Sequence, residues 1–475
     1  MNSDEYKSFD AVSLVQLVEA GEVTALELVD LAINEIEAQD HELGAVVSIN
    51  AEGARQAARS HRQGALAGLP VLIKDTNIDV RGFATRHGSR LYKDAPAAEA
   101  DSELVGRMRN AGAIILGKAK TPEFAGDFVT EPEYFGPCRN PRNPKYASGG
   151  SSGGSACAVG AGMVPVAHGT DCGGSIRVPA SVCGVVGLKP SRGRNPVGPH
   201  VGEFVGGLDS EHVLTRTVRD TALLLDVLAG YESGAPYAAP PAPASWLESL
   251  NKASPSLKIA FSCTRPDGTE IDESIRNAVL HVVDFLGSEG HKLRDFDWPD
   301  LTGAGDAAAV FWQLEIEALM THQAAALGRP IAEGDVEWIT YEMYKQSTCR
   351  SALDVHNARS VQNRVSRRIA TWFEEVDVLI TPTVALAPPL IGGFTASGEK
   401  KLNVWYENAY AFSPFTEIFN LTGQPAISLP VGIMADGLPI GLQIVGRFGD
   451  EETILRLANE IEKSFSSKII YQSKN

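Results

Sequence analysis

The chain has 475 residues, of which 44% are hydrophobic and 21% are charged. This composition is typical of a packed globular protein and excludes an intrinsically disordered chain. With 42 basic and 59 acidic residues, the formal net charge is −17, which argues against binding to nucleic acid or to an anionic membrane.

Three further features bear on the compartment. No run of about 18 apolar residues is present, so the sequence predicts no membrane-spanning helix. The first residues, Met1 to Lys7, contain no basic region followed by an apolar core, so we expect no signal peptide. The six cysteines contain no Cys-x-x-Cys pair, which favours reduced thiols and a cytoplasmic location in a chain of this length.

The first 170 residues predict helices and then buried strands. Apolar residues recur at helical spacing over residues 11–38. Gly21 interrupts this pattern, and Thr24 with Glu27 predicts the capping box of a second helix. Short apolar runs predict buried strands at residues 69–73, 113–116 and from 164 onward.

A proline-rich connector, residues 233–245, separates this part from a second set of elements. A strand, a helix and a strand predict one βαβ-type unit at residues 257–261, 272–287 and 291–296. A mostly helical region, two strands and a closing helix are predicted at residues 305–375, 378–380, 426–429 and 450–465. The alternation of strands and helices predicts one large α/β domain with a central mixed β-sheet flanked by α-helices.

Residues 148–155 are all glycine or serine, and small apolar residues follow at 156–163. The composition alone is typical of a linker, but the apolar continuation favours a glycine-rich turn that enters a buried helix. Two overlapping Gly-x-Ser-x-Gly matches centre on Ser151 and Ser152. The preceding residues, 140–147, contain two prolines and no strand pattern, which argues against the nucleophile elbow of an α/β-hydrolase.

A second glycine cluster spans residues 169–179. Consecutive backbone N–H groups in such a turn can converge on one negative oxygen, and a serine at its end is placed to attack. These residues are Cys172, Gly173, Gly174 and Ser175. A tight turn with a structural serine explains the same residues equally well.

Lys74 ends the apolar run 69–73 and therefore lies at the mouth of a predicted buried strand. Loss of hydration lowers the pKa of a lysine, and the neutral amine can then act as a general base toward a serine. Most lysines at strand ends are simply solvated, so this residue alone does not indicate catalysis.

Together, three segments resemble the amidase signature family. They are Gly68 to Asp75, Gly149 to Ser155 and Gly169 to Ala180. They occur in the order of the family, and the interval between the two serines, 175 − 151 = 24 residues, also fits it. The resemblance covers nearly the whole chain and is greatest to bacterial small-molecule amidases of the 6-aminohexanoate cyclic dimer hydrolase kind.

The resemblance implies an amidase that hydrolyses a C–N acyl bond of a small-molecule amide, with anilides, oligoamides and carbamates (urethanes) in its range. By position, Ser175 resembles the nucleophile, Ser151 the bridging serine in a cis peptide, and Lys74 the base. The N–H groups of residues 172–175 would form the oxyanion hole, and water would cleave the acyl-enzyme. No metal and no cofactor are implied. Supporting roles fall on Ser152, Thr170, Asp171 and Arg177.

The predicted substrate pocket combines segments that lie near the site in the family with aromatic residues of the helical region. Its candidates are Gly126, Phe128, Phe135, Phe204, Trp312, Trp338 and Tyr341. Residues 62–232 would carry the catalytic motifs, 245–345 would cover the substrate, and 346–475 would complete the core of a single domain, 1–475. The expected partner is a small-molecule amide or carbamate, and a homodimer is left open.

Other interpretations were weighed against this one. Gly112 to Lys118 resembles a P-loop, but Ala119 replaces the metal-binding serine or threonine, and the middle of the segment is an apolar strand. His168 lies seven residues before Ser175 and leaves a Ser–His esterase open. A glutamine amidotransferase A-type subunit, which works in a complex, and a non-catalytic scaffold are the remaining alternatives.

Overall fold

The computed structural model describes residues 1–60, 63–252, 254–394 and 400–465, so the predicted boundary at residue 62 lies outside the described residues. The strands are β1 (Val46–Ile49), β2 (Pro70–Lys74), β3 (Ile114–Ala119), β4 (Val166–Thr170), β5 (Val186–Lys189), β6 (Glu211–Thr215), β7 (Lys258–Phe261), β8 (Lys292–Asp295), β9 (Val378–Pro382), β10 (Ala426–Ile433) and β11 (Pro439–Gly446). Within the described residues they form one eleven-stranded sheet in the order β1-β3-β2-β4-β6-β5-β10-β11-β9-β7-β8.

The sheet is mixed, as predicted. Strand β2 runs parallel to β3 and β4, and β7 runs parallel to β8 and β9. The central strands β6, β5, β10 and β11 pair antiparallel with their neighbours. Strands β2 to β6 are buried along their whole length, which explains the continuous apolar runs of β2 and β3.

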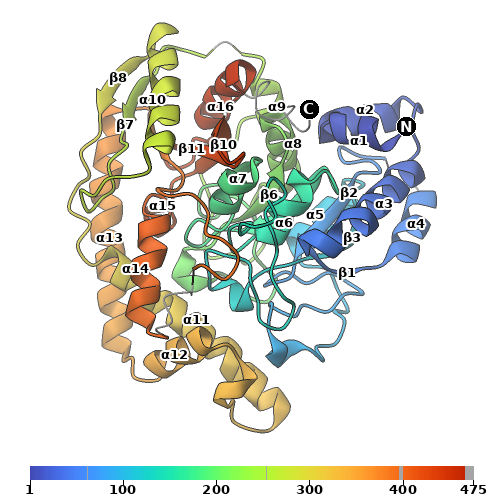
Figure 1. The fold of residues 1–475 in the computed structure, drawn as a ribbon, viewed down its shortest axis with the longest axis horizontal. Helices are drawn as coiled ribbons and strands as arrows, with labels where there is room; N and C mark the ends of the chain where they lie inside the picture. Colours follow the sequence, from blue (N-terminus) through green and yellow to red (C-terminus); the bar gives the residue numbers. More distant parts are fainter. Residues whose placement is uncertain (61–62, 253, 395–399, 466–475) are drawn as a thin grey trace.

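The helices surround this sheet. They are α1 (Ser3–Ser8), α2 (Ala11–Glu19), α3 (Ala25–Leu43), α4 (Ala51–Arg59), α5 (Glu103–Asn110), α6 (Gly153–Gly160), α7 (Arg177–Cys183), α8 (Val218–Leu228), α9 (Trp246–Ser249), α10 (Glu273–Ser288), α11 (Ala304–Leu327), α12 (Trp338–Ser347), α13 (Ala352–Glu375), α14 (Leu402–Phe412), α15 (Glu417–Thr422) and α16 (Glu451–Phe465). Figure 1 shows α1 to α4 at one end of the sheet and α10 with β7 and β8 at the other. None of the helices described is long and apolar enough to cross a membrane.

Most local predictions are confirmed. The capping box forms at the start of α3, where the Thr24 hydroxyl accepts the N–H of Glu27 and the Glu27 carboxylate accepts the N–H of Thr24. Strands β7 and β8 flank α10 and pair in parallel, which is the predicted βαβ-type unit. Strands β5 and β6 were not predicted, because each contains a buried charged residue, Lys189 or Glu211, in place of an apolar run.

The sheet brings the predicted catalytic segments together. Lys74 is the last residue of β2 and Thr170 is the last residue of β4, and these two strands are parallel neighbours. Their carboxyl ends therefore meet at one edge of the sheet. Helix α6 begins directly after Ser152 and packs against β2, β3, β4 and β6, so the glycine–serine segment is held against this same edge.

The central antiparallel strands supply a stability test. Leu442 of β11 is fully buried and lies between Leu429 of β10 and Pro382 of β9. We expect Leu442→Ala to lower the free energy of unfolding by about 2–5 kcal/mol, because it removes buried methyl groups and leaves a cavity. Leu353→Ala, at a side chain that is 65% exposed, should change it by less than about 0.5 kcal/mol. Equal shifts of the urea midpoint in both variants would contradict this packing.

Candidate active site

Lys74 and Ser151 are in direct contact inside the protein. The Lys74 Nζ lies 2.8 Å from the Ser151 Oγ and 2.8 Å from the Thr170 Oγ1, and it can donate a hydrogen bond to each. Lys74 and Ser151 are fully buried. Burial lowers the pKa of Lys74 from 10.5 to about 8, although nearby acidic groups partly oppose the shift. A substantial fraction of this amine is therefore neutral at mildly alkaline pH.

The two glycine-rich segments are tied to each other by hydrogen bonds. The N–H of Ser152 donates to the carbonyl of Ser175 over 3.0 Å, and the Ser152 hydroxyl donates to the carbonyl of Thr170 over 3.2 Å. The Ser155 hydroxyl donates to the carbonyl of His168 over 2.6 Å. The peptide bond between Gly150 and Ser151 is cis. The segment is thus an ordered part of the core and not a linker.

Ser175 lies on the loop between β4 and α7 and is 5% exposed. The preceding residue, Gly174, has a φ of +131°, which disfavours any residue with a Cβ atom. A Cβ at this position would also lie 2.4 Å from the Thr416 Oγ1. The turn that presents Ser175 therefore requires glycine at position 174 both for its backbone angle and for its close contact with the segment before α15.

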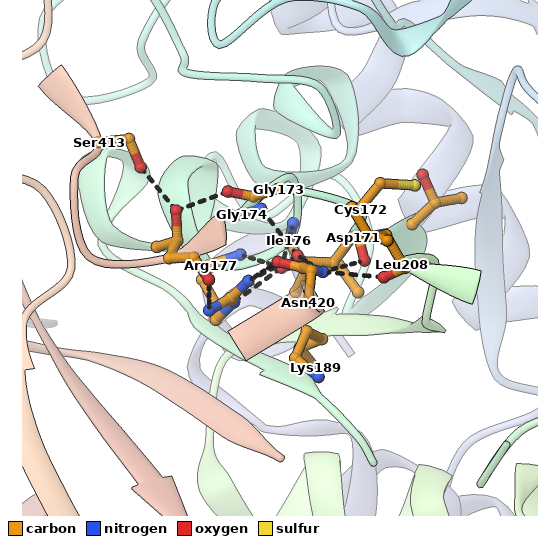
Figure 2. Close-up of polar contacts among 12 residues, drawn as sticks. Asp171, Cys172, Gly173, Gly174, Ile176, Arg177, Lys189, Leu208, Ser413 and Asn420 are labelled. Atoms are coloured by element: carbon orange, nitrogen blue, oxygen red, sulfur yellow. Dashed lines mark hydrogen bonds and ion pairs between the residues drawn. The ribbon is translucent and has the colours of Figure 1, made fainter. Parts of the chain in front are cut away.

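Asp171 organises this loop. Its carboxylate accepts hydrogen bonds from the N–H groups of Gly174, Ile176 and Arg177, over 2.8, 3.1 and 3.3 Å. The same carboxylate pairs with the Arg177 guanidinium through two bonds of 2.9 and 2.8 Å. Figure 2 shows Arg177 and Asn420 converging on this carboxylate. One buried charge therefore holds both the turn and the first residues of α7.

The Arg177 side chain extends the network to distant parts of the chain. Its guanidinium donates to the Gln443 Oε1 of β11, to the Thr416 carbonyl and to the Asn420 Oδ1 of α15, over 2.7, 2.9 and 2.6 Å. Burial alone would raise the pKa of Asp171, but the Arg177 charge and its hydrogen bonds hold that pKa below its usual range. Asp171 is therefore ionised throughout the physiological pH range.

One predicted oxyanion donor is already occupied. Gly174 uses its N–H to bind Asp171, so it is not a free donor as the sequence analysis expected. The structure gives the N–H groups of Cys172, Gly173 and Ser175 no acceptor among the described residues. These three amides remain available to a ligand oxygen.

Ser175 opens into a cavity with aromatic and apolar walls. Three of the predicted pocket residues line it, namely Gly126, Phe128 and Trp312. The other lining residues are Ala125, Asp127, Gly173, Ala309, Met343, Trp405, Tyr406, Ala409, Tyr410 and Glu417. They come from the segment 125–128, from the loop before α7 and from α11, α12, α14 and α15. The helical cover over Ser175 is thus built from both the predicted variable region and the C-terminal part.

Four predicted pocket residues lie outside the lining of this cavity. Trp338 and Tyr341 precede Met343 on α12 by five and two residues, which places them about 140° and 160° around the helix from it. Phe204 is 7% exposed and lines a different cavity, together with Asp209 and Glu211.

The fourth of these residues is Phe135. Its ring packs edge-on against the ring of Tyr134, with their centres 4.8 Å apart. Like the other three, Phe135 is not among the residues that line the Ser175 cavity.

The contribution of α14 and α15 to the wall of the Ser175 cavity was not predicted from the sequence. Trp405 and Ala409, and likewise Tyr406 and Tyr410, are four residues apart on α14 and so share one face of that helix. Glu417, the first residue of α15, completes this wall. The i, i+4 spacing of the aromatic residues was the available signal, but it does not distinguish a cavity wall from a core face.

The two motifs that suggested another function, His168 and the segment that resembles a P-loop, have structural roles. His168 is fully buried in β4, and its Nε2 lies 2.7 Å from the Glu211 Oε2. Burial lowers the pKa of His168 to about 3, so this ring is neutral and bonded away from Ser175. The segment that resembled a P-loop forms strand β3, and its Lys118 is buried and donates to the carbonyl of Ile78 over 2.9 Å.

The Asp171–Arg177 pair yields a stability prediction. Asp171→Asn leaves the buried guanidinium without its carboxylate, so we expect a loss of about 3–5 kcal/mol in the free energy of unfolding. The exposed pair of Arg329 and Asp335 is the matched control, and Asp335→Asn should change the same quantity by less than about 1 kcal/mol. Denaturant unfolding measures both variants, and a loss for Asp171→Asn no larger than that for Asp335→Asn would show that the network is dispensable.

Comparison with known proteins places this geometry in a family. Residues 27–455 match the family model described as Amidase. A 6-aminohexanoate-cyclic-dimer hydrolase from Paenarthrobacter ureafaciens is 37% identical in a 469-residue alignment that covers 95% of this chain and 94% of that protein.

Solved structures support the same family. One of a 6-aminohexanoate cyclic dimer hydrolase complexed with substrate matches with a TM-score of 0.92 at 34% identity, covering 96% of this chain and 97% of that one. A bacterial aryl acylamidase of the amidase signature enzymes matches with a TM-score of 0.88 at 26% identity, covering 98% of this chain and 99% of that one. The chain therefore belongs to the amidase signature family.

Proposed function

We propose that this protein hydrolyses the C–N acyl bond of small-molecule amides through Ser175, Ser151 and Lys74. The observation that carries the proposal is the buried 2.8 Å contact between the Lys74 Nζ and the Ser151 Oγ, beside the loop on which Ser175 faces a cavity. A buried amine with a lowered pKa in contact with a serine can act as a general base toward that serine.

In the proposed first half-reaction, neutral Lys74 accepts the proton of the Ser151 hydroxyl, and Ser151 accepts the proton of Ser175. The Ser175 Oγ then attacks the acyl carbon, and the C=O π electrons move to oxygen to form a tetrahedral oxyanion. The free N–H groups of Cys172, Gly173 and Ser175 are the proposed donors to that oxyanion. Collapse breaks the C–N bond, and the relay returns the proton to the leaving amine.

The second half-reaction removes the acyl group from Ser175. Water loses a proton to the same relay and attacks the ester carbonyl, a second tetrahedral oxyanion forms, and its collapse returns the proton to Ser175. Every step uses side chains and amides of this chain. The Asp171–Arg177 network keeps the donor amides in place and touches neither the substrate nor the transferred proton.

The cavity supports a substrate with apolar or aromatic parts. Its walls include Phe128, Trp312, Trp405 and Tyr406. Relatives named for the 6-aminohexanoate cyclic dimer and for aryl acyl amides belong to the same family. We therefore propose small amides, anilides and oligoamides as the substrate class, with carbamates as a further candidate. We also propose a cytoplasmic location for the protein.

The first test is turnover of a chromogenic panel that contains an anilide, a primary amide, an ester and a carbamate. We expect Ser175→Ala, Ser151→Ala and Lys74→Ala each to lower kcat/KM for the preferred class by about 10³-fold or more, because the three groups act as one unit. Circular dichroism establishes that each variant is folded.

His168→Ala is the control for the esterase alternative. A Ser–His enzyme would lose activity in this variant and keep it in Lys74→Ala, whereas the proposed relay predicts the reverse order. A Ser175→Ala variant with full activity would refute the mechanism altogether.

The assignment of Lys74 as the base also predicts how kcat/KM depends on pH. Only the deprotonated amine of Lys74 can accept a proton, and its pKa lies at about 8. We therefore expect kcat/KM for a neutral substrate to fall about tenfold per pH unit below pH 8 and to level off above it. A flat profile between pH 5 and pH 9 would contradict the assignment of Lys74 as the base.

A further inference from the structure

Two carboxyl groups line the Ser175 cavity and have no part in the proposed relay. Asp127 lies in the segment 125–128 and Glu417 begins α15. Both are half-buried, and both face a cavity whose other walls are mostly aromatic or apolar. Carboxyl groups in such surroundings need a partner, because an unpaired buried charge is unfavourable.

Glu417 is placed next to the proposed oxyanion loop. Its Oε1 accepts the hydroxyl of Tyr410 over 2.9 Å. A Cβ atom on Gly173 would lie 3.7 Å from its Oε2, so this oxygen faces the loop that presents Ser175. The structure gives the Oε2 no hydrogen-bond partner among the described residues. Burial raises the pKa of Glu417 to about 7, and only the Tyr410 hydroxyl opposes that shift.

Asp127 has similar surroundings. Its Oδ1 accepts the N–H of Val129 over 3.3 Å. Burial raises its pKa to about 7, and the neighbouring carboxylate of Glu131 adds to this shift, while hydrogen bonds from the N–H groups of Val129 and Phe128 and from the Trp405 side chain oppose it. Within the described residues, neither Asp127 nor Glu417 forms an ion pair with a lysine, arginine or histidine of this chain.

The cavity thus contains two carboxyl groups that form no ion pair within the described residues, together with several aromatic side chains. The aromatic side chains that line it are Phe128, Trp312, Trp405, Tyr406 and Tyr410. An ammonium ion is attracted by the faces of aromatic rings and forms charge-assisted hydrogen bonds with carboxylates. A neutral acyl chain would leave both carboxylates without a counter-charge.

We propose that Asp127 and Glu417 form a subsite for a primary ammonium group, and that the preferred substrates are amides that carry such a group near the scissile bond. This inference rests on the proposed function and names its substrate class. The aromatic walls would hold the intervening methylene groups, while Glu417, beside Gly173, would hold the charge close to the reacting carbonyl. Asp127 and Glu417 are specificity residues here and take no part in proton transfer.

The test compares matched substrates. They are ω-aminoacyl 4-nitroanilides with two- to six-carbon acyl chains and their isosteres, in which a methyl group replaces the ammonium group. At pH 8, where both carboxyl groups lie above their pKa of about 7, we expect wild-type kcat/KM to be at least about tenfold higher for the best ammonium substrate. Glu417→Gln and Asp127→Asn should each reduce this ratio about tenfold, because each variant should lose more activity toward the ammonium substrate than toward its methyl isostere.

Glu462→Gln is the matched control. Glu462 is also a half-buried carboxyl with a pKa raised to about 7, but it accepts the N–H of Val218 and is not part of the cavity lining. This variant should retain the wild-type ratio. A wild-type ratio near one at every chain length would overturn the proposal. A loss in Glu417→Gln that is equal for ammonium and methyl substrates would overturn it too, since it would indicate a structural role or a neutral hydrogen bond.

A binding measurement separates this inference from the proposed function. Titration calorimetry of the wild type with hexylammonium chloride should show binding at least about tenfold tighter than with 1-hexanol, and Glu417→Gln should remove the difference. Equal binding of the two probes would refute the ammonium subsite even if anilides are hydrolysed. If the wild type hydrolyses no substrate of the chromogenic panel and none of the anilides, the proposed function fails, while the titration still decides the subsite.

Discussion

The buried ion pair between Asp171 and Arg177 is the interaction on which the rest of the site depends. Two opposite charges with no exposure remain in the core only if their hydrogen-bonding capacity is filled, and here it is filled by backbone N–H groups of the loop and by side chains of α15 and β11. The pair therefore joins the loop after β4 to elements more than two hundred residues away. By occupying the N–H of Gly174, it also determines which amides remain free beside Ser175.

The chain separates chemistry from recognition. Lys74, Ser151 and Ser175 are held by strand ends and helix starts of the first half, where the sheet is buried along its length. The cavity walls come largely from α11, α12, α14 and α15, which lie beyond the catalytic segments in the sequence. Figure 1 shows these helices gathered on one side of the molecule. The division is incomplete, because Thr416 and Asn420, which flank the pocket residue Glu417, also hold the loop of Ser175 through Arg177 and Asp171.

Much could be predicted from the sequence alone, because local rules govern it. The capping box at Thr24, the βαβ-type unit of β7, α10 and β8, and the buried strands β2 and β3 all follow from short-range patterns. The family, the mixed α/β fold and the proximity of Lys74 to Ser151 followed from motifs whose residues and spacing are specific. The catalytic roles of these residues stay predictions until the variants are measured.

The features of the site that could not be predicted from the sequence depend on packing between distant segments. The capture of the Gly174 N–H by Asp171, the position of Phe204 and Phe135 outside the lining of the Ser175 cavity, and the approach of Glu417 to Gly173 are all set by the tertiary structure. The lowered pKa of Lys74 was inferred from its place at the end of a buried strand, but the size of the shift depends on burial by distant segments. Helical periodicity shows that a residue shares a face with others, but only the tertiary structure decides whether that face meets the core or a cavity, because both bury apolar surface equally well.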